Sequence, residues 1–156
     1  MGATHSTKLN SILLRISDRF IIAKTFFPLS VTDLRHIRLL FAEDQASKQF
    51  ILKKILGKLS IVPTIVYDGE QAIDAFKTAE YDIVFLDVQM PIMGGYQASK
   101  QIRQINSEVP IIPISAAVLP TSLEEAKSNG MNEFIGKPYS AEEILDVIEA
   151  FLPKPL

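Results

Sequence analysis

The segment that most constrains the fold is residues 83–86, Ile-Val-Phe-Leu, which is followed directly by Asp87. Each of these residues is apolar, so the alternation expected of a half-exposed strand is absent. A short continuous apolar run is typical of a strand covered on both faces, as in a parallel sheet flanked by helices. Asp87 would then end this strand, at the carboxyl edge where open parallel sheets place their chemistry.

Composition narrows the class of protein around this strand. The chain has 156 residues, 47% of them hydrophobic and 22% charged, which predicts one globular domain with room for an appendage. A net charge of -2 argues against nucleic-acid binding, and the absence of Cys excludes disulfides and thiolate chemistry. We find neither a signal peptide nor an apolar stretch long enough to span a bilayer, so we expect a cytoplasmic location without membrane insertion.

Strand and helix signals alternate regularly from residue 37 onward. A helix over residues 46–59 carries Phe50 on its apolar face, Pro63 suggests an edge position for the second strand, and residues 122–125 resemble a helix cap. The expected strands are residues 37–42, 61–66, 83–87, 110–115 and 132–136, and the expected helices are residues 46–59, 70–79, 95–106, 121–129 and 140–152. This alternation predicts an α/β fold, a three-layer αβα sandwich around a doubly wound five-stranded parallel sheet.

Residues 1–35 do not continue this alternation. Leu9, Leu13, Ile16 and Phe20 fall at helical spacing, whereas the stretch around Phe20 would also suit a strand. One interpretation is a linker left from a larger upstream protein. The other is an amphipathic arm that packs on the domain or pairs with a second copy in a homodimer. The expected domain itself covers residues 36–153.

Polar side chains follow four of the predicted strands. Glu43 and Asp44 follow the first, Asp87 ends the third, Ser115 ends the fourth and Lys137 follows the fifth. Each alone has an ordinary explanation as a helix cap, a turn or a solvated surface residue. Together they meet at one edge of a parallel sheet, where clustered carboxylates suit Mg²⁺. A lysine and a hydroxyl beside that cation suit a phosphoryl group, with the Asp87 carboxylate as nucleophile.

Four motifs make the resemblance to a known family specific. They are residues 40–45 (LFAEDQ), 85–96 (FLDVQMPIMGGY), 111–116 (IIPISA) and 130–138 (GMNEFIGKP). With these motifs, residues 37–152 resemble the receiver domain of two-component response regulators, most closely the receivers attached to hybrid histidine kinases. The resemblance implies a flavodoxin-like fold with strand order 2-1-3-4-5. It also implies that this domain accepts a phosphoryl group from phosphohistidine and signals by conformational change, without being an enzyme in its own right.

The resemblance assigns a role to each residue of the acidic edge. Asp87 matches the phosphoacceptor, and Lys137 matches the lysine that binds the phosphoryl group. Asp44 and Glu43 match the acidic pair that holds Mg²⁺ together with Asp87 and the backbone carbonyl of Gln89. The implied partner is a histidine kinase core or a histidine phosphotransfer protein, and the helix over residues 46–59 is the expected docking surface.

Other positions match the switching apparatus of the family or depart from it. Ser115 matches the switch hydroxyl and Phe134 the aromatic switch residue, which moves inward when that hydroxyl turns toward the phosphoryl group. Backbone amides of Val88 and Ala116 are expected to complete the cradle for phosphoryl oxygens. Gly94 stands where such receivers usually carry Asp, which we expect to loosen the loop and to alter partner contacts.

Three other functions compete with this interpretation. A phosphatase of the haloacid-dehalogenase type would carry a second acid two positions after its nucleophile, where this chain has Gln89. A pure interaction module would not need the complete set of acidic, hydroxyl and lysine groups. A kinase would need a glycine-rich nucleotide-binding segment, which the sequence lacks, and a phosphorylated His36 is less expected than a surface histidine.

Overall fold

The computed structural model describes residues 34–152, which form one parallel sheet and its covering helices. The strands are β1 (Leu39–Ala42), β2 (Thr64–Val66), β3 (Ile83–Asp87), β4 (Ile111–Ser115) and β5 (Ile135–Gly136). The helices are the 3-10 turn η1 (Leu34–His36), α2 (Ala46–Lys58), α3 (Gly69–Thr78), α4 (Gly95–Ile105), α5 (Pro120–Ser128) and α6 (Ala141–Phe151). The sheet order is β2-β1-β3-β4-β5 with every pairing parallel, which confirms the predicted fold class.

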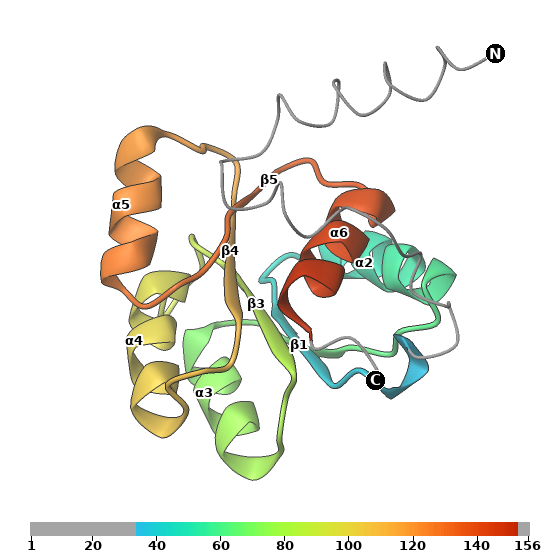
Figure 1. Ribbon diagram of the computed structural model, residues 1–156, viewed down its shortest axis with the longest axis horizontal. Helices are drawn as coiled ribbons and strands as arrows, with labels where there is room; N and C mark the ends of the chain where they lie inside the picture. Colours follow the sequence, from blue (N-terminus) through green and yellow to red (C-terminus); the bar gives the residue numbers. More distant parts are fainter. Residues whose placement is uncertain (1–33, 153–156) are drawn as a thin grey trace, which may run out of the picture. The chain divides into compact units, whose positions relative to one another are not determined.

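Helices cover both faces of the sheet, with α2 and α6 on one face and α3, α4 and α5 on the other (Figure 1). The apolar run of β3 divides between these faces. Ile83 and Phe85 join the cluster under α2 and α6, whereas Val84 and Leu86 join the cluster under α3 to α5. All of them are fully buried, which explains why the strand has no polar positions to alternate.

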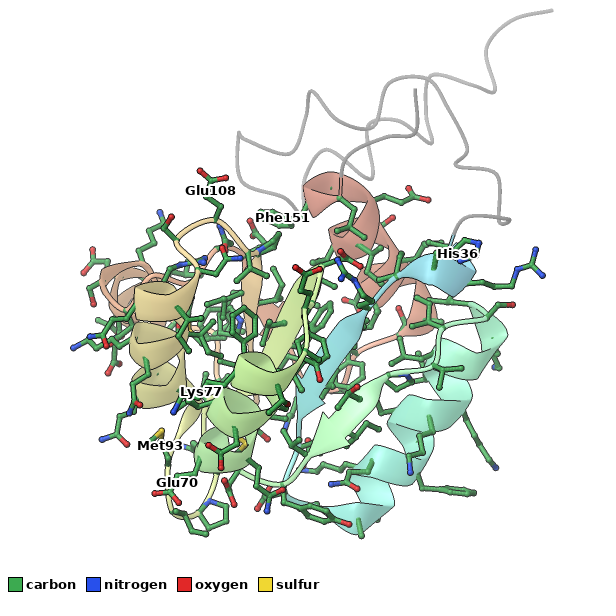
Figure 2. All side chains as sticks on the ribbon, turned by 90° about the horizontal axis from the view of Figure 1, so that it is seen from below. His36, Glu70, Lys77, Met93, Glu108 and Phe151 are labelled. Carbon is green, nitrogen blue, oxygen red and sulfur yellow. The ribbon has the colours of Figure 1, made fainter. Side chains whose placement is uncertain are left out.

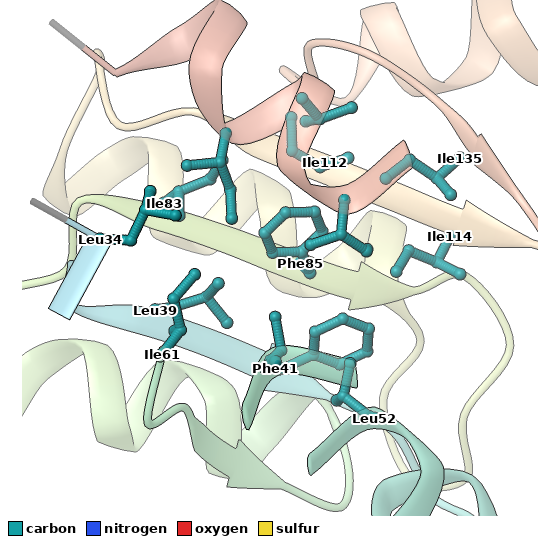
Figure 3. Packing of buried hydrophobic residues seen from close by; sticks show 14 residues of the cluster. Leu34, Leu39, Phe41, Leu52, Ile61, Ile83, Phe85, Ile112, Ile114 and Ile135 are labelled. Carbon is teal, nitrogen blue, oxygen red and sulfur yellow. The ribbon is translucent and has the colours of Figure 1, made fainter. Parts of the chain in front are cut away.

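Two aromatic rings lie at the centre of the α2/α6 layer. Phe41 of β1 pairs in register with Phe85 of β3, and their rings stack with centroids 5.4 Å apart (Figure 3). The Tyr139 ring packs at a tilt against Phe41 at 6.2 Å. Phe41 and Phe85 lie one or two positions before the ends of their strands. The packing that stabilises the core therefore also fixes the carboxyl edge of the sheet.

The third strand, β3, has its predicted bounds, and the other four strands are shorter than the sequence suggested. Ile61 was expected in β2, but its N–H donates to the carbonyl of Leu56 at 3.0 Å and so completes the end of α2. Pro63 cannot donate to a ladder, and β2 begins only after it. The prediction that β2 is an edge strand is confirmed.

Two helix details were wrong and one was right. Phe50 does not face the core, because its side chain is 60% exposed. The capping pattern expected at residues 122–125 is absent, since α5 starts earlier with Pro120 in its first turn and no side-chain cap from Leu119. The last helix was expected to begin at residue 140, and Ser140 is its N-cap; Ser140 and Glu143 also form a reciprocal capping box, which was not predicted.

The predicted arm lies almost wholly outside the described residues, so both interpretations of it stay predictions. Leu34, on the arm side of the expected boundary, is 6% exposed and belongs to the α2/α6 core cluster. The packed part of the chain therefore includes this residue. None of the helices within residues 34–152 is long and apolar enough to cross a bilayer.

An ion pair joins β1 to β3 at the amino end of the sheet. Arg38 donates to the Asp82 carboxylate from its backbone N–H at 2.8 Å and from Nη2 at 2.7 Å, and Nη1 contacts Glu80 at 2.6 Å. The hydrogen bonds from Arg38 hold the pKa of Asp82 below its usual value. A depressed carboxyl pKa stabilises the fold above the unfolded pKa of about 3.9, and this contribution is lost as pH falls through the folded pKa.

Asp82→Asn is therefore expected to lower the free energy of unfolding by about 1 kcal/mol at pH 7. The deficit should shrink as the pH falls from 7 to 3, because the unfolded state takes up a proton below its pKa of about 3.9 and the advantage of the ionised carboxylate in the folded state diminishes. Urea unfolding at the two pH values measures this. Glu80→Gln is the matched control: Glu80 is 85% exposed and its loss should leave stability unchanged. A deficit for Asp82→Asn that does not vary with pH would contradict the charge-based explanation.

Candidate functional site

The carboxyl edge of the sheet brings together residues that lie far apart in the sequence. Glu43 directly follows β1, Asp87 ends β3, Ser115 ends β4 and Lys137 directly follows β5. Figure 2 separates the two edges: Met93 and Glu70 lie toward this one, while His36, Glu108 and Phe151 lie at the opposite ends of the strands. The Lys137 N–H donates to the Ser115 carbonyl at 2.8 Å, which carries the β4–β5 ladder to the site.

Three carboxylates and one ammonium group form the centre of the site. Oxygen atoms of Glu43, Asp44 and Asp87 lie within 4.8 Å of one another. Glu43 is fully buried and Asp87 is 5% exposed, whereas Asp44 is half-buried. Lys137 Nζ lies 3.1 Å from Glu43 Oε2 and makes a short ion pair with Asp87 Oδ2. With the carboxylates ionised, one lysine leaves an excess of negative charge that favours a further cation.

The pKa values at this edge follow from burial and from the lysine. Burial raises the pKa of Glu43, and the Gln45 N–H and Lys137 oppose this without reversing it. Burial alone would lower the pKa of Lys137, but Asp87 and Glu43 outweigh it and raise this pKa. Burial raises the pKa of Tyr139 to about 12, helped by the negative charge of Glu43 and Asp87. Lys137 is therefore a cation at neutral pH, and Tyr139 is a neutral phenol.

The backbone amide beside Asp87 is not the one the sequence suggested. The Val88 N–H donates to the Ile114 carbonyl at 2.9 Å and continues the β3–β4 ladder, so the prediction that it faces the phosphoryl group was wrong. The Gln89 N–H instead donates to Asp87 Oδ1 at 3.0 Å. The pairing of β3 with β4 could have predicted this, because a residue that prolongs a parallel ladder directs its N–H to the neighbouring strand.

The two switch candidates lie on β4 and just before β5. Ser115 Oγ accepts from the Ala117 N–H and donates to the Ala117 carbonyl, both at 3.2 Å, so its hydroxyl bonds within its own loop. Phe134 is half-buried and packs against the cluster under α3 to α5. The inward movement of both groups stays a prediction, as does the role of the Ala116 amide.

The loop after Asp87 is held by backbone hydrogen bonds. The Met93 N–H donates to the Pro91 carbonyl at 2.7 Å around Ile92, whose φ is 66°. The Gly69 N–H at the start of α3 donates to the Met93 carbonyl at 2.9 Å. Gly94 has an ordinary φ of -76°, and a Cβ there would lie 2.9 Å from the Val88 carbonyl oxygen. An Asp at position 94 would therefore crowd this loop in its present conformation.

The donor set fits a hard divalent cation. Mg²⁺ prefers carboxylate and carbonyl oxygens, and it is commonly bound through one or two carboxylates with water completing the shell. Glu43, Asp44 and Asp87 supply such oxygens from within one small volume, and Gln89 lies beside Asp87 through its backbone N–H. Because nitrogen and sulfur ligands are absent from this cluster, the site suits Mg²⁺ better than Zn²⁺.

This fold and this site together define a class of protein. A five-stranded sheet of order 2-1-3-4-5 with an acidic cluster, a hydroxyl and a lysine at its carboxyl edge is the arrangement of a receiver. Residues 39–149 match the family model described as the response regulator receiver domain. The chain belongs to this family, and it is a receiver domain of two-component systems.

Relatives and solved structures agree with this assignment. The transcriptional regulatory protein RprY of Bacteroides fragilis is 33% identical over 116 residues, which are 74% of this chain and 49% of that protein. The hybrid signal transduction histidine kinase K of Dictyostelium discoideum is 30% identical over 122 residues, 72% of this chain and 10% of that kinase. The chain thus spans about half or less of the length of these two relatives, which are named as a transcriptional regulatory protein and a hybrid histidine kinase.

One solved structure bears on the metal site. The receiver domain of the sensor histidine kinase PA1611 from Pseudomonas aeruginosa matches with a TM-score of 0.69 and 29% identity, covering 74% of this chain and 96% of that one. That structure has a magnesium ion coordinated in its active-site cleft.

Proposed function

We propose that Asp87 accepts a phosphoryl group from a phosphohistidine of a partner protein. An oxygen of the Asp87 carboxylate attacks phosphorus, the new O–P bond forms as the P–N bond breaks, and the electron pair of that bond returns to the imidazole. The observation that carries the proposal is the position of Asp87, 5% exposed, within an acidic cluster and paired with Lys137. Proton transfer by a carboxylic acid would not need a lysine beside it, whereas transfer of an anionic phosphoryl group needs positive charge at this position.

The surrounding groups have complementary tasks in this transfer. Lys137 neutralises charge on the phosphoryl oxygens, and the Gln89 N–H, now on Asp87 Oδ1, lies where it can donate to one of them. Ser115 would exchange its bond to the Ala117 carbonyl for a phosphoryl oxygen. That exchange, with the inward movement of Phe134, would change the surface near β4 and β5.

A magnesium ion would be held by Glu43, Asp44, Asp87 and the carbonyl of Gln89. When bound, it supplies positive charge that offsets the negative charge on the phosphoryl oxygens. The chain's own residues then orient the acceptor: Lys137 fixes Asp87 Oδ2 and the Gln89 N–H fixes Oδ1. Because each carboxylate oxygen has one of these contacts, the two together fix the orientation of the Asp87 carboxylate.

The test is phosphorylation by acetyl phosphate in the presence of Mg²⁺. We expect a phosphoryl adduct, labile to hydroxylamine, on the wild-type chain, and its loss by at least two orders of magnitude in Asp87→Asn. Asp82→Asn is the matched control, because it alters an Asp at the opposite end of the same strand. An undiminished yield in Asp87→Asn, or an adduct mapped to another residue, would refute the proposal.

We propose further that the partner docks on the exposed surface of α2. Phe50 and Ile51 are 60% and 55% exposed, and Lys54 Nζ lies 4.5 Å from the centre of the Phe50 ring. Apolar side chains among cations suit an amphipathic helix with acidic residues at its margin. The yeast receiver of Ssk1, similar in fold at a TM-score of 0.66, was solved in complex with the histidine phosphotransfer protein Ypd1. A histidine kinase core is the alternative partner, inside a hybrid kinase.

Charge reversal on α2 tests this docking surface. Lys53 and Lys54 are both exposed and lie outside the acidic site. Phosphorylation by acetyl phosphate should therefore not change in Lys53→Glu or Lys54→Glu. Transfer from a phosphorylated histidine phosphotransfer domain should slow about tenfold, because repulsion replaces attraction. Equal losses with both donors would count against the surface, and unchanged transfer would refute it.

A further inference from the structure

We propose that Gln49 is a positioning residue that orients the acidic pair Glu43 and Asp44 for Mg²⁺. The inference rests on the proposed function, since it concerns the same metal site. Gln49 lies in the first turns of α2 and is 6% exposed. Its Nε2 donates to the backbone carbonyl of Glu43 at 2.6 Å.

The helix itself does not require this side chain. The backbone N–H of Gln49 already donates to the Gln45 carbonyl at 2.9 Å, as an ordinary helical bond. Burying a primary amide costs free energy that an apolar side chain of the same size would not incur. The side chain turns back to the end of β1 instead of filling the core, which indicates that its task is the contact with Glu43.

Besides the ion pair of its Oε2 with Lys137, Glu43 is held by three hydrogen bonds, of which the contact with Gln49 is one. Its N–H donates to the Val66 carbonyl at 3.0 Å, its Oε1 accepts from the Gln45 N–H at 3.0 Å, and its carbonyl accepts from Gln49. That carbonyl belongs to the peptide plane that leads into Asp44. With this peptide plane held in place, the side chain of the half-buried Asp44 extends from the backbone in a defined direction.

Orientation matters here because Mg²⁺ demands near-octahedral geometry at short distances. Groups that hold metal ligands without touching the metal typically change metal affinity by 10- to 100-fold when they are removed. Gln49 binds the backbone carbonyl of Glu43, whose carbon is bonded directly to the nitrogen of Asp44. The same residue, Glu43, also supplies a carboxylate to the metal site. Loss of its amide would let both ligands deviate together.

The test is a calorimetric titration of the unphosphorylated chain with Mg²⁺ alone. Gln49→Met keeps the length of the side chain and removes its donor. We expect its Mg²⁺ dissociation constant to rise about tenfold. Ser99→Ala is the matched control: the buried Ser99 Oγ donates to the Asn129 carbonyl at 2.8 Å, away from the acidic pair. It removes a buried hydrogen-bond donor, as Gln49→Met does, and should leave Mg²⁺ affinity unchanged.

A wild-type dissociation constant in Gln49→Met, or equal weakening in Ser99→Ala, would overturn the inference. Gln49→Asn, whose amide is one methylene too short to reach the carbonyl, repeats the test should the Met variant fail to fold, with the same weakening expected. Failure of the wild-type chain to bind Mg²⁺ would overturn the proposed metal site and this inference with it. Binding that is insensitive to Gln49 would overturn this inference alone and leave Asp87 as the acceptor.

Discussion

Lys137→Met is expected to slow phosphorylation of Asp87 by acetyl phosphate at least about 100-fold, the usual scale for removing one preorganised charge partner of a developing anion. Lys137 Nζ is the cation in contact with both Glu43 and Asp87. Without it, a second anion approaching Asp87 meets uncompensated negative charge. Mg²⁺ binding should persist or tighten, since the competing ammonium is gone. Phosphorylation rates and Mg²⁺ titrations on the same preparation separate the two effects.

The same variant should also lose about 3 kcal/mol of stability at neutral pH, because Glu43 is fully buried and would lack its partner. Burial already raises the pKa of Glu43, and loss of Lys137 removes a group that opposes this rise. A carboxyl with a raised folded pKa binds more protons folded than unfolded, so stability falls as pH rises above the unfolded pKa of about 4.3. Lys137→Met should therefore be less destabilised at pH 5 than at pH 7.5.

Urea unfolding at those two pH values measures the effect, with Lys100→Met as a control on an exposed lysine of α4. A destabilisation that is equal at both pH values would mean that packing of the lysine stem, not its charge, stabilises the site. Wild-type phosphorylation in Lys137→Met would remove this residue from the proposed mechanism.

The sequence predicted the fold and the cluster for a physical reason. Five apolar runs with helical spacers leave a parallel sheet as the simple solution, and a parallel sheet gathers its strand ends on one edge. Asp87 and Lys137 could be assigned to one site without knowing any distance, because only the order of elements mattered. The acidic pair followed in the same way.

What escaped prediction depended on hydrogen bonds that a linear pattern does not encode. Gln89, not Val88, points its N–H at Asp87, because Val88 continues the ladder to Ile114. Phe50 looked like a core residue by type, yet it lies on the exposed side of α2. Gln49 gave no signal at all, since a glutamine on a helix is ordinarily a surface residue.

Arg103 is a further residue whose role depends on hydrogen bonds. No role was assigned to it from the sequence, and its contacts became visible only in three dimensions. Its guanidinium donates to the carbonyls of Val109 at 2.6 Å and Gly130 at 2.7 Å, and to Asn132 Oδ1 at 2.9 Å, which in turn accepts from the Ile111 N–H. Arg103 thus supports the amino end of β4, at the opposite end of the strand from Ser115.

Gly95 is the second position where a small change should have a large effect. It is the first residue of α4 and is buried, and a Cβ there would lie 2.5 Å from the backbone oxygen of Asp87 and 3.1 Å from its carbonyl carbon. The obstacle is backbone, so it cannot rotate away as a side chain would. Gly95→Ala must therefore move the start of α4 or the end of β3, and the latter carries the acceptor.

We expect Gly95→Ala to lose about 3 kcal/mol of stability, and at least about tenfold in phosphorylation rate through displacement of Asp87. Gly57→Ala is the matched control within the same chain, because no atom beyond its chain neighbours and the nearby helix backbone lies within 4 Å of a Cβ at that exposed position in α2. There the substitution should stabilise the helix by about 0.5 to 1 kcal/mol and leave phosphorylation unchanged. Urea unfolding and acetyl phosphate kinetics on both variants measure these effects. If steric closeness to Asp87 causes the loss in Gly95→Ala, the two variants should change the free energy of unfolding in opposite directions. A stable, fully active Gly95→Ala would show that β3 and α4 can separate at their junction without displacing the acceptor carboxylate.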